Sequence, residues 1–108
     1  MDAAETLKLI EELGGETVIY RPRAGGSREV TALVDRDRPG GLGNAPHGES
    51  GTAEILVANS SEIGIAASEV NRGGDRVEMV SRLGRNAVVR PIKRILAHDG
   101  GGVRLEIR

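Results

Sequence analysis

The chain has 108 residues, with 15 basic and 16 acidic side chains and a formal net charge of −1. This length predicts one domain, residues 1–108, with a modest core. The balanced charge argues against a nucleic acid or an anionic membrane as partner. The lack of cysteine excludes a disulfide framework and a thiolate metal site or nucleophile. The apolar runs are too short for a signal peptide or a membrane span, so we expect synthesis in a reducing cytoplasm.

Residues 2–13 are predicted to form a helix. Asp2 can cap its first turn, and Glu5 follows at the spacing of a capping box. An apolar stripe at helical spacing is formed by Leu9, Ile10 and Leu13. The helix is predicted to end at Gly14-Gly15, because glycine readily takes the left-handed conformation that follows a helix.

From Glu16 onward the apolar residues alternate with polar ones, which is typical of strands. The predicted strands are Glu16–Arg21, Arg28–Asp35, Ala53–Ala58, Asp75–Ser81 and Gly102–Arg108. A further segment, Asn86–Asp99, is interrupted by Pro91, which implies an edge strand, a bulge or two short strands. Short strands at this spacing predict a mainly β fold: a small β-sandwich or barrel over residues 16–108, preceded by the helix.

The core is expected to consist of aliphatic side chains, because Tyr20 is the only aromatic residue of the chain. The alternation of apolar and polar residues predicts which positions face inward. They are Val18 or Ile19, Val30, Val34, Ile55, Val57, Val77, Val89, Ile95, Leu105 and Ile107. The helix is expected to pack against one end of the barrel.

The segment from Asp35 to Thr52 is predicted to be a long loop. It is rich in glycine, has no apolar period, and contains Leu42 as its only sizeable apolar residue. A loop of this length in a small domain either has a function or is disordered. It has no lysine for a Walker loop, and it leads into a strand rather than into the helix of a dinucleotide site. Its segment GESGT departs from the nucleophile elbow, because Thr52 stands in place of the second glycine.

A serine–histidine–acid site could draw only on Ser50, His47 or His98, and Asp99. Both histidines lie in predicted loops beside glycine, without the rigid support that a catalytic base needs, so we assign no catalytic residue. Two histidines without cysteine do not suffice for a structural zinc site, and we expect no metal and no cofactor. The segment His98–Gly102 is instead predicted to be a turn, in which Asp-Gly and Gly-Gly supply positive φ.

Arginine supplies nearly all of the positive charge and gathers in two clusters. On strand faces it can be solvated and protect sheet edges. Its planar guanidinium also suits ion pairs with a protein partner, whereas binding to nucleic acid lacks stacking aromatic residues. The sequence leaves the first two readings open. The clusters are Arg21, Arg23 and Arg28, and then Arg82, Arg85, Arg90 and Arg94.

A series of short patterns follows the predicted helix in a fixed order. A strand that ends in Asp is followed by a long insertion, by Ser-Glu-Val, by Gly-Asp-x-Val, by I-x-x-x-D-G and by an alternating last strand. The positions are Asp35, Ser68-Glu69-Val70, Gly74-Asp75-Arg76-Val77, Ile95, Asp99-Gly100 and Leu105-Glu106-Ile107. In this order the chain resembles, over nearly its whole length, the lambda-type phage head–tail joining family and its prophage relatives. It departs from that family at Ala87-Val88-Val89, where many relatives have an aromatic residue.

The resemblance implies a structural protein of the virion neck, with no catalysis and no cofactor. Such proteins form a homo-oligomeric ring between the DNA-filled head and the tail, and their fold is similar to tail-tube and tail-terminator β-sandwiches. The implied partners are the phage portal or connector and the tail proteins. We expect a monomer in isolation, made in the bacterial host cytoplasm, with no specific nucleic-acid recognition and no membrane. The alternatives are a tail-terminator or tail-tube-like protein, or a small β-barrel that binds a ligand or nucleic acid.

In such a ring, Asp35–Thr52 is expected to be mobile in the free monomer and to become ordered against a neighbouring subunit or the tail. Its alternating charges suit pairing across a heterologous interface. The alternative is a tolerated insertion, since loop insertions cost little entropy. The expected interface residues are Arg36, Asp37, Arg38, Leu42, Asn44, His47 and Glu49.

Overall fold

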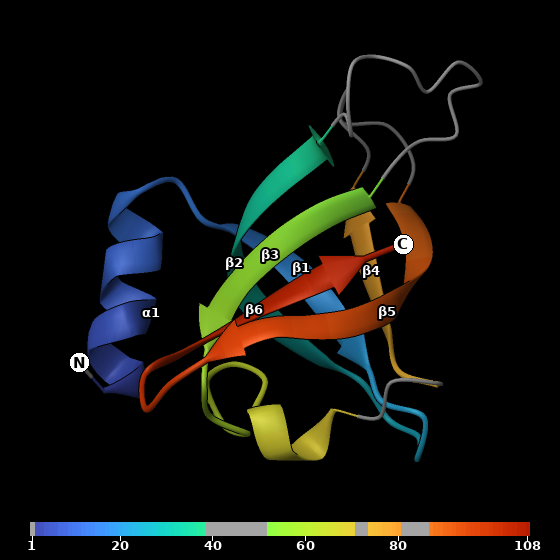
Figure 1. Cartoon of the computed structure of the whole chain (residues 1–108). Coiled ribbons are helices and arrows are strands. Elements are labelled where there is room, and N and C mark those ends of the chain that lie inside the picture. Colours follow the sequence, from blue (N-terminus) through green and yellow to red (C-terminus); the bar gives the residue numbers. More distant parts are fainter. Residues whose placement is uncertain (1, 39–51, 71–73, 81–86) are drawn as a thin grey trace.

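The computed structural model describes residues 2–38, 52–70, 74–80 and 87–108. Six antiparallel strands close into a barrel, and one α-helix lies against its outer wall (Figure 1). The elements are α1 (Ala3–Glu12), β1 (Glu16–Arg21), β2 (Arg28–Arg38), β3 (Thr52–Ala58), β4 (Arg76–Val80), β5 (Ala87–His98) and β6 (Gly102–Ile107), with a short 3₁₀ helix at Ala67–Glu69. The mainly β fold with an N-terminal helix is therefore confirmed, as a barrel.

The barrel consists of two three-stranded meanders. The strands β1, β2 and β3 pair in chain order, and so do β4, β5 and β6. Two long-range pairings, β3 with β6 and β1 with β4, join the meanders along both sides. The resulting order around the barrel is β1-β2-β3-β6-β5-β4, so the β2–β3 wall lies opposite the β4–β5 wall.

The barrel interior is filled by alternate side chains from all six strands. Most of the positions expected to face inward are buried, and Val34 and Ile95 pack partly buried against the cluster. Confirmed core residues are Val18, Val30, Ile55, Val57, Val77, Leu105 and Ile107. Core residues absent from the expected set include Tyr20, Ala32, Ala53, Ile65, Met79, Ile92 and Val103. Tyr20 is the largest fully buried side chain, so the one aromatic residue is central to the core.

The expected inward position of Val89 is wrong. Its side chain is 44% exposed, whereas Ile92, three residues later, is 4% exposed. The reason is a bulge: the register of β5 against β6 shifts after Ile92, and β5 passes from β4 to β6 beside Pro91. The Pro91 carbonyl accepts a hydrogen bond from the Arg108 N–H at 2.9 Å. Of the three readings of this segment, the bulged strand is the one observed.

The helix α1 begins at the expected capping box. The Asp2 carboxylate accepts from the Glu5 N–H, and the Glu5 carboxylate accepts from the Asp2 N–H, both at 2.9 Å. After the helix, Gly14 has φ +99°, as expected for a residue that ends a helix. Among the described residues, no helix is long and apolar enough to cross a membrane.

The expectation that α1 packs against one end of the barrel is wrong. The helix lies along the outer wall formed by β2 and β3 (Figure 1). Ile10 is fully buried there but is not part of the interior cluster. Thr31 and Leu56, on the outer faces of these strands, are half-buried. This outward surface gives the apolar side of the helix a place to pack.

The predicted loop Asp35–Thr52 is shorter than expected at both ends. Strand β2 continues to Arg38, and β3 begins at Thr52, with Arg38 paired to Thr52. The last residues of β2 are charged and show no alternation of apolar and polar side chains, so nothing in the sequence indicated a strand there. These residues pair through main-chain hydrogen bonds, which do not depend on side-chain type.

Candidate functional site

Four polar side chains from distant parts of the chain meet near the end of the barrel where the β1–β2 hairpin turns. We call Tyr20, Arg28, Glu69 and Asp75 the polar cluster. The Tyr20 hydroxyl donates a short hydrogen bond to the carboxylate of Asp75, which is 1% exposed. The other oxygen of Asp75 accepts from the Arg23 N–H at 2.8 Å. Asp75 therefore connects the start of β4 to β1 and to the hairpin turn.

Arg28 extends the polar cluster to the connection between β3 and β4. Its guanidinium carbon lies 4.9 Å from the centroid of the Tyr20 ring, a cation–π geometry. The same guanidinium donates to the Gly64 carbonyl at 3.0 Å and to Glu69 at 2.6 Å. Glu69 also accepts from the Ala66 N–H at 2.7 Å. The cluster thus fastens this connection to the barrel.

The contacts in the polar cluster favour a structural role over a catalytic one. The hydroxyl and both carboxylates are held by partners within the protein. The pKa of Tyr20 is raised above its ordinary value, first by burial and then by its hydrogen bond to Asp75 and the charge of that carboxylate. The charge of Glu69 acts in the same direction and that of Arg28 opposes it. Tyr20 therefore stays protonated over the usual pH range.

We expect alkaline pH to destabilise the protein through Tyr20. Below about pH 10, the ordinary tyrosine pKa, the hydroxyl is protonated in both states. Above it, the unfolded chain releases the proton and the folded protein retains it, so the free energy of unfolding falls by about 1.4 kcal/mol per pH unit. Urea unfolding at a series of alkaline pH values measures this slope. Tyr20→Phe should remove it, and an equal slope in both proteins would contradict the prediction.

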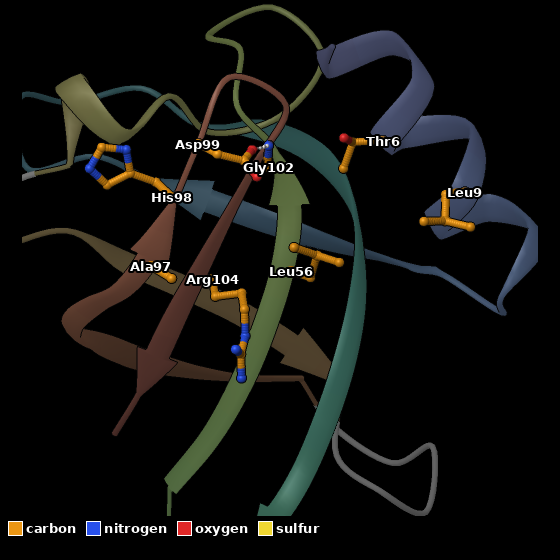
Figure 2. A pocket seen from close by; sticks show the side chains of 8 residues that line it. All are labelled: Thr6, Leu9, Leu56, Ala97, His98, Asp99, Gly102 and Arg104. Carbon is orange, nitrogen blue, oxygen red and sulfur yellow. Dashed lines mark hydrogen bonds between the residues drawn. The ribbon is translucent and has the colours of Figure 1, made fainter. Parts of the chain in front are cut away.

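A groove on the outer surface lies beside α1. Its volume is about 250 Å³. A row of paired outward residues on β3, β6 and β5 forms its floor, namely Leu56, Arg104 and Ala97. Thr6 and Leu9 of α1 form one side, and Figure 2 shows Leu9 and Leu56 pointing toward each other. His98, Asp99 and Gly102 complete the lining.

The polar groups of this groove are largely held by neighbours. The Asp99 carboxylate accepts from the N–H groups of Gly101 at 2.8 Å and Gly102 at 2.9 Å, which lowers the pKa of Asp99. Arg104 forms a 2.7 Å ion pair with Glu54. The surface left for a partner beside α1 is therefore mainly apolar.

The predicted turn at His98–Gly102 is present, but its expected mechanism is wrong. The Asp99 N–H donates to the Gly102 carbonyl at 3.0 Å. The positive-φ glycines of the described chain are Gly14, Gly25 and Gly26, so none lies in this turn. The Asp99 side chain closes the turn by hydrogen bonding, as aspartate commonly does.

The arginine clusters are partly explained by contacts within the barrel. Arg21 pairs with Glu78 at 2.5 Å, and Arg94 pairs with Glu106 at 2.7 Å, both between neighbouring strands. Arg90 donates to the Arg108 carbonyl at 2.7 Å. Arg82 and Arg85 lie outside the described residues. The pairs on the outer faces match the cross-strand stabilisation expected of opposite charges.

The predicted interface residues are only partly placed. Arg36, Asp37 and Arg38 belong to the backbone of β2. The other predicted interface residues lie outside the described residues, namely Leu42, Asn44, His47 and Glu49. Ser50, considered above for a serine–histidine–acid site, also lies outside them. Within the described ranges, no three histidine, aspartate or glutamate side chains gather as a metal site.

Sequence reasoning missed both the polar cluster and the groove. Tyr20 is two residues after Val18 and faces inward on the same side of the strand. Because a buried tyrosine hydroxyl needs a hydrogen-bond partner, this position could have indicated a polar residue in the interior. The groove had no such signal, because it depends on where α1 packs.

Comparisons with known proteins add no family to these observations. No protein-family model, curated protein or solved structure matches the chain.

Proposed function

We propose that this chain is a non-enzymatic assembly protein of a phage or prophage virion, which joins the DNA-filled head to the tail as part of a ring of subunits. The proposal rests on two acidic residues, Glu69 and Asp75, which belong to the sequence patterns that resemble the head–tail joining family. Glu69 and Asp75 both lie in the polar cluster and hold the connection between β3 and β4 to the barrel. A framework of this kind is what a structural subunit needs.

The outer surface also supports the proposal. A closed barrel has no edge strand to pair with another chain, so a partner must contact side chains of the walls. Exposed apolar side chains lie at two places on the outer surface, with Leu9 on α1 and Leu13 at its C-cap, and Val89 on β5. Exposed apolar patches of this kind often mark protein contacts.

The ligand-binding alternative has less support. A barrel that binds a small molecule commonly holds it in the interior or the mouth, and here the interior is filled by side chains that are at most 4% exposed. The external groove is lined by the charged residues Asp99 and Arg104, but both are engaged within the protein. A ligand site uses convergent polar groups to orient its ligand.

Gene deletion tests the proposal. In the phage or prophage whose genome carries this gene, deletion should yield DNA-filled heads and separate tails in electron micrographs, with infectivity lost. Supplying the gene from a plasmid should restore complete particles, and the protein should then be detected in them by mass spectrometry. Normal tailed, infectious particles from the deletion strain would overturn the proposal. Genes for portal, capsid and tail proteins beside this gene are the expected genomic context.

A further inference from the structure

Two small surface patches lie on opposite walls of the barrel. The helix patch consists of Leu9 on α1 and Leu13 at its C-cap, bordered by Glu5 and Glu12. The strand patch consists of Val89 and Pro91 on β5, with Arg76 and Lys93 beside them. Leu9 is 37% exposed, Leu13 58% and Val89 44%.

The helix patch follows from helical geometry. Leu9 and Leu13 are four residues apart, so they share one face, and Glu5 and Glu12 lie one turn from Leu9 along the same side. Leu9 also lines the groove beside α1, together with Leu56. The patch is therefore an apolar stripe that continues into a hollow and has an acidic border.

The strand patch follows from the register of β4 and β5. Val89 and Pro91 are two residues apart and project from the same outer face, and Arg76 pairs directly with Pro91. Lys93 follows two residues later and is exposed. Among the residues that the structure describes, Glu12, Arg76 and Lys93 have no ion-pair partner. These charges are therefore available to another molecule.

We infer that a second copy of this chain is the occupant, with the helix patch of one copy against the strand patch of the next. The inference deepens the proposed function and rests on it. The patches are complementary in charge, since glutamates border the helix patch and Arg76 and Lys93 border the strand patch. Glu78, which pairs with Val89 in the sheet, has its charge balanced by Arg21. Two helix patches facing each other would instead bring their acidic borders together.

The positions of the patches predict the form of the assembly. The helix lies over the β2–β3 wall, and the strand patch lies on the opposite β4–β5 wall (Figure 1). A contact between two different surfaces is heterologous, so each copy leaves one patch free for a further copy and the series can close into a ring. A few apolar side chains are a small area compared with a stable interface, so the contact forms at the high local concentration of an assembly.

Cysteine cross-linking tests this arrangement, because the natural chain contains no cysteine. Leu13→Cys and Val89→Cys are made as two single variants and as one double variant. Each variant, and a mixture of the two single variants, is treated with a short thiol-specific cross-linker at high protein concentration. We expect a cross-linked dimer from the mixture of the two single variants and little from either alone. The double variant should give a ladder of higher oligomers. Ser27→Cys, on the exposed turn between β1 and β2, replaces Val89→Cys in the matched control.

Charge reversal gives a second measurement. Glu12→Lys on the Leu13→Cys partner should lower the yield of the mixed dimer roughly fivefold, and Arg76→Glu on the Val89→Cys partner should restore it.

The outcomes separate the alternatives. Efficient cross-linking of Leu13→Cys with itself would overturn the inference in favour of a symmetric dimer. Yields equal to the Ser27→Cys control, or no cross-linking at all, would also overturn it. A head-to-tail ladder together with a deletion strain that assembles normally would overturn the proposed function but support the inferred interface. A deletion strain with separate heads and tails, without cross-links between these patches, would support the proposed function and overturn the inferred interface.

Discussion

Replacing Asp75 with alanine is expected to lower the free energy of unfolding by about 3 kcal/mol. The change removes the acceptor of the Tyr20 hydroxyl and of the Arg23 N–H. Tyr20 is fully buried and remains in place, so its hydroxyl loses a partner that water cannot readily replace. For a domain of this size the melting temperature should fall by roughly 10–20 °C. Urea unfolding and thermal melts followed by circular dichroism measure both quantities.

Two variants show whether the hydrogen bonds cause this loss. Asp75→Asn keeps the shape and can still accept from the Arg23 N–H and donate to the Tyr20 oxygen, so it should cost about 1 kcal/mol. Adding Tyr20→Phe to Asp75→Ala should cost less than the sum of the single changes, since the orphaned hydroxyl is gone. A cost below 1 kcal/mol for Asp75→Ala would contradict this account of the polar cluster.

Gly64→Ala is expected to destabilise the fold by roughly 3 kcal/mol or more. A methyl group at Gly64 would overlap the backbone carbonyl of Ala58, which cannot rotate away as a side chain can. That carbonyl accepts from the Ile65 N–H at 3.0 Å, and the Gly64 carbonyl accepts from Arg28. Relief of the clash therefore disturbs the backbone and the polar cluster together. Chemical unfolding of the variant measures the cost.

Gly100→Ala is the matched control for this change. Gly100 lies in the turn between β5 and β6, where an added methyl group meets nothing within 4 Å and the backbone φ is not positive. The variant should unfold at nearly the natural denaturant concentration. Similar losses for both alanine variants would mean that the close approach to Ala58 is not the cause.

Strand positions were predictable where the backbone keeps a regular register. The alternation of Val103, Leu105 and Ile107 matches their burial, because successive side chains of a strand face opposite sides. The bulge in β5 breaks this rule after Ile92, and no residue type marks it uniquely in the sequence. Residues 59–70 have no period, so the burial of Ile65 depends on tertiary packing alone.

The candidate sites were less accessible from the sequence than the fold. Tyr20 and Asp75 are 55 residues apart, and Arg28 and Glu69 are 41 apart. The meeting of Tyr20 with Asp75 requires the pairing of β1 with β4, which no local pattern specifies. The strand patch also depends on the outward position of Val89, the residue for which the alternation was misleading.

The two pairings that join the meanders bear on how the chain reaches its native state. Contacts within each meander are made mostly by neighbouring strands, but the β1–β4 contact between Arg21 and Glu78 spans 57 residues and the β3–β6 contact between Glu54 and Arg104 spans 50. Such distant contacts form slowly, because the chain between them must first be ordered. Until both have formed, each meander presents two unpaired edges to any other chain. The interval before closure is therefore when a newly made chain is most exposed to aggregation.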